Sequence, residues 1–222
     1  MKLHRAINTT LCKLVEQYYA PENEGTYHNI KHVYDCLDTL LLHKEALQNE
    51  FPDIEWDLML QSVLFHDACY QPGDNAAEIE ACAVYKRAVR NPDVRVMRII
   101  LSTSRNFNIV YKRPEELIMH DLDYYCFVTM DSLKDAEYRI INEFATAMGR
   151  SEDEVLEGRV KFYKELLAEA YDKGGSLFLT ATFAKYNAKV IKNIETRLEE
   201  LGEDLPRNPG STITPAQGSL AD

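Results

Sequence analysis

The sequence of 222 residues lacks a long apolar run, since no stretch of roughly 18 uncharged apolar residues occurs, as a membrane-spanning helix requires. Its first residues, Met1 to Lys13, carry charges where a secretory signal peptide has an unbroken apolar segment. We therefore expect a soluble chain that is neither exported nor inserted into a membrane.

Paired cysteines are also missing. Five cysteines are scattered along the chain without a Cys-x-x-Cys motif, namely Cys12, Cys36, Cys69, Cys82 and Cys126. Their odd number and irregular spacing suggest neither a disulfide framework nor a zinc site built from thiolates. This cysteine usage predicts a reducing, cytoplasmic compartment.

Positive charge is in deficit, because 25 basic residues face 36 acidic residues and the formal net charge is −11. Proteins that hold duplex nucleic acid neutralise many phosphates with Lys and Arg, so this class of partner is not expected. A small phosphate ligand remains compatible with the charge. The sequence does not fix the oligomeric state and is compatible with an oligomer.

Alternation of period two is scarce, whereas apolar residues recur with a period near 3.6. Two such stripes are Ile30, Val33, Leu37, Leu40, Leu41 and Trp56, Met59, Leu60, Val63, Leu64. Ser151-x-x-Glu154 has the form of a capping box that begins a helix reaching about Ala170. Residues 177 to about 201 show a further amphipathic pattern. The sequence predicts an all-α bundle of about eight helices.

The last segment of the chain differs in composition from the rest. From Gly202 onward it contains three Gly and three Pro but few large apolar residues. Such a composition buries too little apolar surface to offset the entropy lost on ordering. We therefore expect one domain over residues 1–201 and a flexible, disordered tail over 202–222.

Histidine and aspartate residues at two places in the predicted helices are candidate metal ligands. His28 and His32 are four residues apart and share one helix face, a spacing that is also common on exposed helix surfaces. His66 and Asp67 end the apolar run 56–65, where burying two ionisable groups requires a compensating partner. A divalent cation would be such a partner.

A third place is Asp121-Leu-Asp123, which lies between apolar segments. Asp121 has a simple structural explanation as a helix N-cap, whereas Asp123 has none. Two imidazoles and two carboxylates suit Mn²⁺, Fe²⁺, Co²⁺, Ni²⁺ or Zn²⁺, and Mg²⁺ where water completes the coordination sphere. A site of this kind leaves coordination positions open, as a hydrolytic site requires.

Together these motifs resemble those of the HD superfamily of metal-dependent phosphohydrolases. Over about residues 10–200 the chain looks most similar to the branch known as predicted metal-dependent HD phosphohydrolases. The motifs that carry this similarity are Tyr19-Ala-Pro, Tyr27-His28, His32-Val33 and Phe65-His66-Asp67-Ala68-Cys69-Tyr70. The resemblance implies an HD-domain helical bundle with the metal ligands His32, His66, Asp67 and Asp123, and with His28 as a fifth ligand or a phosphate contact.

Three segments depart from that branch. Its Asn-Glu-x-x-Ser-Ala segment corresponds here to residues 77–82, where only Glu78 is retained, and its Thr-x-x-His reads Thr103-Ser-Arg-Asn106. Gly25 and Thr26 stand where the branch has an arginine before Tyr-His. These departures leave the implied metal ligands intact and affect the groups that would contact the substrate.

The resemblance implies a hydrolase that cleaves a phosphate ester or anhydride of a nucleotide or similar small molecule. Glu78 or Asp67 would direct the proton of the attacking water. The substrate-side candidates are His28, Lys31, Tyr27, Tyr70 and Arg105. Each has a structural alternative, because isolated cations are usually solvated and tyrosines at helical spacing usually belong to the core.

Two other functions stay open. A di-iron oxygenase with an HD fold needs additional histidines between the His-Asp pair and the distal aspartate, an interval that here contains His120 alone. The other alternative is a non-catalytic, nucleotide-binding regulatory module that keeps its metal for stability.

Overall fold

The structure is a computed structural model that describes residues 9–20, 25–105 and 110–206. Within these ranges it contains eleven α-helices, one 3₁₀ helix and no strand, so the expected all-α class is confirmed, with more short helices than the eight predicted. None of the helices in these ranges is long and apolar enough to cross a membrane. Residues 207–222, most of the predicted tail, lie outside the described ranges.

The elements follow one another along the chain with short connections. They are α1 (Thr9–Glu16), α2 (Ile30–Leu42), α3 (Lys44–Glu50), α4 (Trp56–Phe65), α5 (Ala77–Ala88), α6 (Val94–Leu101), α7 (Pro114–Asp123), the 3₁₀ helix η2 (Tyr124–Val128), α8 (Met130–Met148), α9 (Glu152–Asp172), α10 (Ala181–Ala184) and α11 (Asn187–Glu200). The two predicted stripes correspond to α2 and α4.

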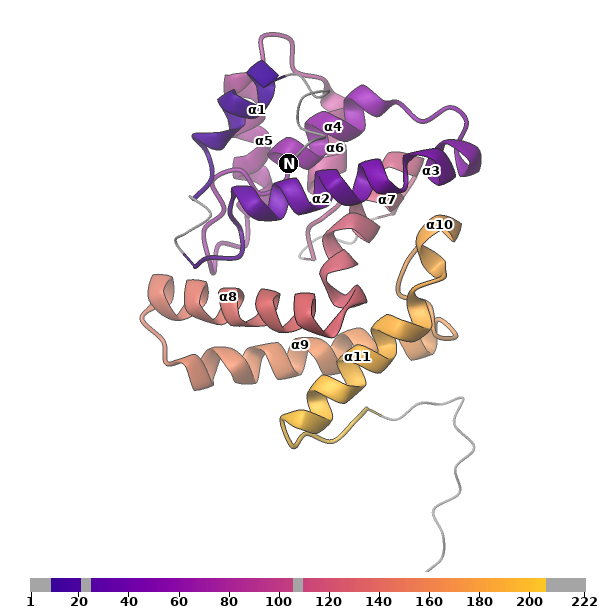
Figure 1. Ribbon diagram of the computed structural model, residues 1–222. Helices are drawn as coiled ribbons and strands as arrows, with labels where there is room; N and C mark the ends of the chain where they lie inside the picture. Colours follow the sequence, from indigo (N-terminus) through magenta and orange to yellow (C-terminus); the bar gives the residue numbers. More distant parts are fainter. Residues whose placement is uncertain (1–8, 21–24, 106–109, 207–222) are drawn as a thin grey trace, which may run out of the picture.

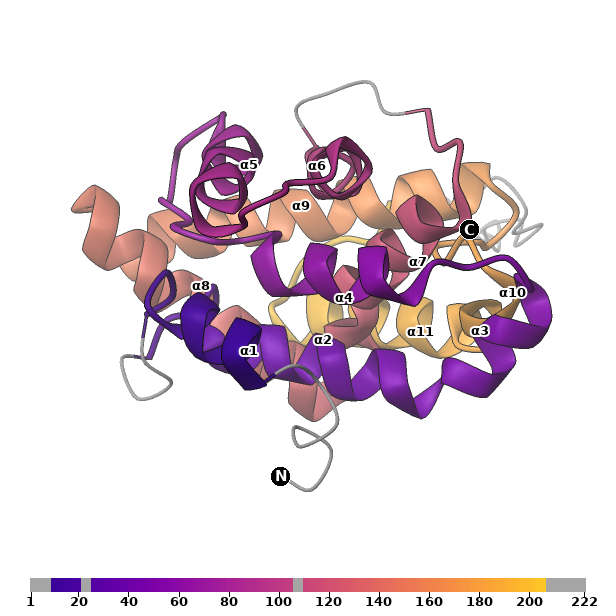
Figure 2. The same cartoon turned by 90° about the horizontal axis from the view of Figure 1, so that it is seen from above.

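The helices form two layers that η2 connects. Helices α1 to α7 gather in one layer, and α8, α9 and α11 form the other, as Figure 1 shows. The 3₁₀ helix η2 packs against α7 of the first layer and against α8 and α11 of the second. The same arrangement seen from above is shown in Figure 2. The chain thus passes from one layer to the other directly after Asp123.

Helix α4 lies at the centre of the first layer, where it packs against α2, α5, α6 and α7. Met59, Val63, Leu64 and Phe65 of α4 are completely buried. Each such side chain contributes about 1.5–3 kcal/mol through removal of apolar surface from water. The residue after this apolar helix, His66, is therefore held in a fixed position at the inner edge of the core.

Of two predicted helix boundaries, the start at Ser151 is confirmed and the start at residue 177 is wrong. Ser151 and Glu154 form the expected reciprocal capping box, and α9 extends to Asp172. The amphipathic segment predicted over 177–201 instead begins with the non-helical residues 177–180 and is divided into α10 and α11 by a turn at residues 185–186. The Asn187 side chain accepts hydrogen bonds from the backbone N–H groups of Leu177 and Phe178, which holds the chain in this non-helical course.

Candidate metal centre

Three helices of the first layer bring four metal-ligand side chains together. His32 lies on α2, His66 and Asp67 follow the last residue of α4, and Asp123 is the last residue of α7. One ligand atom of each lies within 4.8 Å of a ligand atom of every other. Because α4 packs against both α2 and α7, the core fixes this convergence.

The distances between these atoms fit a single bound ion. The Nε2 atom of His32 lies 3.2 Å from Nε2 of His66 and 3.4 Å from a carboxylate oxygen of Asp67 and of Asp123. Nε2 of His66 lies 3.0 Å from Oδ2 of Asp67. Ligands bound at about 2.1 Å in octahedral or tetrahedral geometry are separated by about 3.0–3.4 Å, so the spacing matches.

The orientation of His66 is set by the last turn of α4. Its Nδ1 atom lies 2.9 Å from the carbonyl oxygen of Val63, which accepts the Nδ1 proton. This hydrogen bond leaves Nε2 with its lone pair directed at the other ligands, as is usual for histidines that bind metal ions. At the start of α2, Asn29 caps the helix by accepting from the N–H groups of Lys31 and His32.

The electrostatics of the cluster require a positive charge among the carboxylates. Burial alone lowers the pKa of His66, but the carboxylate of Asp67 outweighs this effect and raises the pKa to about 9. In turn the His66 imidazolium, against the opposing effect of burial, holds the pKa of Asp67 well below its usual range. A proton and a divalent cation both supply this charge, and they compete for the same nitrogen.

A thiol that the sequence analysis did not single out belongs to the same neighbourhood. Cys36 lies one turn after His32 on α2, and it forms a second candidate ligand group with His32 and His66. The His-x-x-x-Cys spacing could have revealed it, because residues four apart share a helix face. Burial and the nearby carboxylates raise the pKa of the Cys36 thiol well above 9, which favours the two-carboxylate group over the thiolate.

The expectation that Asp121 caps the start of a helix is wrong, because Asp121 lies near the end of α7 and is completely buried. Its carboxylate accepts hydrogen bonds from the N–H groups of Leu179 and Thr180 and from the Thr180 hydroxyl, at 2.8–2.9 Å. Asp121 therefore fixes the segment before α10. The structure places Asp123, and not Asp121, among the candidate ligands.

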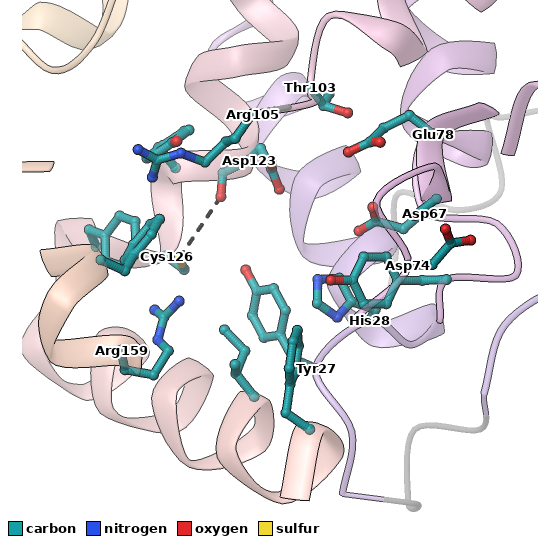
Figure 3. A pocket seen from close by; sticks show the side chains of 17 residues that line it. Tyr27, His28, Asp67, Asp74, Glu78, Thr103, Arg105, Asp123, Cys126 and Arg159 are labelled. Atoms are coloured by element: carbon teal, nitrogen blue, oxygen red, sulfur yellow. Dashed lines mark hydrogen bonds between the residues drawn. The ribbon is translucent and has the colours of Figure 1, made fainter. Parts of the chain in front are cut away.

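The candidate ligands open into a cavity of about 270 Å³ (Figure 3). Asp67 and Asp123 line this cavity. Five of the other predicted site residues line it as well, namely Tyr27, His28, Tyr70, Glu78 and Arg105. Lys31 does not line this cavity. It forms an ion pair with Asp35 and lines a separate space of about 100 Å³ together with His32 and Cys36.

His28 lies in the cavity wall but outside the candidate ligand group. Its Nδ1 atom lies 2.7 Å from a carboxylate oxygen of Glu143 on α8, and its ring stacks on Tyr70 with 3.6 Å between ring centroids. Although burial opposes it, the hydrogen bond to Glu143 raises the pKa of His28. The imidazole of His28, with its raised pKa, thus faces the cavity, as a residue that contacts a phosphate would.

Glu78 begins the first turn of α5 and faces the same cavity as Asp67, as Figure 3 shows. One of its carboxylate oxygens is buried and has no hydrogen-bond partner within the described ranges. Burial raises the pKa of Glu78 above its ordinary value. A carboxylate in this state is a better proton acceptor than a solvated one.

The far wall of the cavity contains residues that the sequence analysis missed. Arg159 and Phe162 project from α9, and Phe144 from α8, all in the second layer. Nothing in the local sequence marks these residues, because they reach the cavity only through the packing of the two layers. His120 stacks on Tyr124 and lines a neighbouring cavity that shares Arg105 and Asp123 with the first.

The fold and the site define an all-α protein with a candidate His₂Asp₂ metal centre that opens into a polar cavity. Comparisons with family models, with curated proteins and with solved structures found no match to this chain.

Proposed function

We propose that this chain is a metal-dependent phosphohydrolase that cleaves a phosphate ester or anhydride of a nucleotide or similar small molecule. The main support is the convergence of His32, His66, Asp67 and Asp123, of which the two aspartates line a cavity. The resemblance of these same motifs to the HD superfamily supports the same proposal.

The donor set fits a divalent ion such as Mn²⁺, Fe²⁺, Co²⁺, Ni²⁺, Zn²⁺ or Mg²⁺. Four protein ligands, two nitrogen and two oxygen, leave room for further ligands on the side that faces the cavity. A bound divalent ion would supply Lewis-acid activation of water and of a phosphoryl oxygen. Asp67 and Asp123 would hold the ion and border the cavity at the same time.

The residues around the ligands have separate tasks in this proposal. Glu78 accepts the proton of the attacking water, since its carboxylate is partly desolvated and lines the cavity on the same side as Asp67. His28 and Arg105 donate hydrogen bonds to phosphate oxygens of the substrate. Tyr27 and Tyr70 form aromatic walls, and Tyr70 is held in place by its stacking on His28.

The test is turnover by protein stripped of metal and reloaded with each of the six cations in turn. Release of inorganic phosphate would be measured on a panel of nucleoside mono-, di- and triphosphates and small phosphate esters, beside the metal content of each preparation. We expect hydrolysis that depends on the cation and that His66→Ala and Asp67→Ala abolish.

A matched control is Asp57→Asn, because Asp57 is an exposed carboxylate on the same helix, α4, outside the cavity. This variant should keep wild-type metal content and turnover. Equal phosphate release by the stripped protein, or wild-type turnover by His66→Ala, would contradict the proposal.

A further inference from the structure

Two arginines of the cavity lack the carboxylate partners that most other arginines in the described ranges have. Arg105 and Arg159 both line the cavity, and neither lies within ion-pair distance of a carboxylate in the described ranges. Of the eight arginines in the described ranges outside the cavity, the exposed Arg90 and Arg150 form no such pair, and six do, namely Arg87, Arg95, Arg98, Arg113, Arg139 and Arg197. In a chain with a net charge of −11, two unpaired arginines at one cavity need an explanation.

Both guanidinium groups contact the same aromatic ring. The Cζ atoms of Arg105 and Arg159 lie 4.6 and 4.5 Å from the ring centre of Phe162. The ring attracts each cation, and two positive charges gathered at one ring favour an anion nearby. The Nε atom of Arg159 is buried without a hydrogen-bond partner in the described ranges, so one donor is left unused.

Arg159 of this pair lies across the cavity from Asp67 and Glu78, whereas Arg105 follows α6 of the first layer and lines the cavity near Asp123. Asp67 and Glu78 belong to the first layer, whereas Arg159 and Phe162 belong to α9 of the second layer. Figure 3 shows Asp67 and Glu78 on one side and Arg159 on the opposite side, with Tyr27 between them. The cavity therefore has an acidic end that suits a cation and a basic end that suits an anion.

We infer that Arg105 and Arg159 form a second, phosphate-binding subsite, so that the substrate is a small molecule with two phosphate groups. One phosphate would face the metal ligands, which rests on the proposed function, and the other would lie at the arginine pair. Two guanidinium charges match a phosphate, which carries about two negative charges at pH 7, better than they match a carboxylate. Bidentate contacts from arginine suit the oxygens of either phosphate.

The experiment uses protein held in chelator, so that only the basic end can attract anions. Binding of inorganic phosphate would be measured by titration calorimetry, with acetate as the carboxylate probe. We expect saturable phosphate binding that exceeds acetate binding and that weakens about tenfold or more in Arg105→Gln and in Arg159→Gln. Asp123→Asn should bind phosphate at least as well as wild type, because it removes a negative charge from the other end.

Arg150→Gln is the matched control, since Arg150 is exposed, follows α8 and does not line the cavity. Thermal melting would verify that each variant is folded, and Arg105, being exposed, tests the subsite independently of the partly buried Arg159. Absence of phosphate binding by the wild-type protein, wild-type phosphate affinity in either glutamine variant, or acetate binding as tight as phosphate binding would overturn the inference. Failure of metal-dependent turnover with phosphate binding retained would instead refute the proposed hydrolase alone.

Discussion

At the scale of single residues, two aspartates only two positions apart have different tasks. Asp121 receives three hydrogen bonds from the segment at 179–180, and Asp123 lies among the candidate metal ligands. Residues two apart on a helix point in different directions, so both cannot face one centre. The sequence indicated Asp123 by its motif, but it could not reveal the task of Asp121, because the partners of Asp121 lie 58 and 59 positions away.

The two asparagine variants should therefore differ in kind. Asp123→Asn should weaken metal binding by more than about tenfold, since it removes a charged ligand, and should leave the thermal midpoint of the metal-free protein nearly unchanged. Asp121→Asn should keep the metal affinity and cost about 2–4 kcal/mol of stability, because the amide presents N–H groups to N–H donors in a buried site. Metal titration and thermal melting of both variants test this, and the opposite ranking would exchange the two roles.

Glu78→Gln separates catalysis from metal binding. The amide keeps the shape of the side chain but cannot take a proton, so turnover should fall about 10²- to 10⁴-fold while metal content stays normal. Glu80→Gln is the control, because Glu80 is exposed on the same helix and pairs with Arg87. Near-wild-type turnover of Glu78→Gln would leave Glu78 as a favourable charge at the start of α5.

At the scale of helices, prediction succeeded where the signal was local. The capping box at Ser151 and the apolar stripes of α2 and α4 depend on residues within a few positions of one another. The segment 177–201 was misjudged because periodicity records the order of apolar residues and not the hydrogen bonds of Asn187 to Leu177 and Phe178. The spacing of apolar residues cannot show that a side chain accepts hydrogen bonds from backbone N–H groups about ten positions away.

The capping box of α9 should contribute to stability without affecting the site. Ser151→Ala removes the acceptor for the Glu154 N–H and should cost about 1 kcal/mol, or about 2–4 °C in the thermal midpoint. Ser151→Asp keeps an acceptor and should restore most of the loss. Metal affinity should be equal in all three proteins. An unchanged midpoint in the alanine variant would show that the start of α9 frays in the native protein.

At the scale of the whole molecule, the cavity is formed by two layers that the sequence could not place together. The first layer supplies the candidate ligands, which stand in recognisable sequence motifs. The second layer supplies Arg159 and Phe162, which belong to no such motif. The periodicity of the sequence predicts that the chain is helical. It does not predict that α9 packs in the layer opposite α4 and α7, because this packing depends on contacts between side chains far apart in sequence. The basic end of the cavity therefore emerged only from the structure.

In the proposed metal centre, a divalent ion and a proton would compete for the imidazole of His66, so the stability of the protein would depend on both. In metal-free protein the pKa of His66 is raised from its ordinary 6.5 to about 9. This group therefore stabilises the fold fully below pH 6.5, and the contribution is lost as the pH rises through 9. A divalent ion stabilises the fold instead by binding the deprotonated nitrogen, so its effect should grow over the same interval.

We accordingly expect the midpoint difference between metal-loaded and chelated protein to increase from pH 6 to pH 9. With the ion at about a hundred times its dissociation constant, the stabilisation is about 2.7 kcal/mol, which corresponds to about 5–11 °C. Thermal melts at several pH values, with and without chelator, measure this difference. His66→Ala should show little difference at any pH, and Asp57→Asn should behave like wild type. A difference that is constant with pH, or that shrinks as pH rises, would show that the metal does not bind at His66.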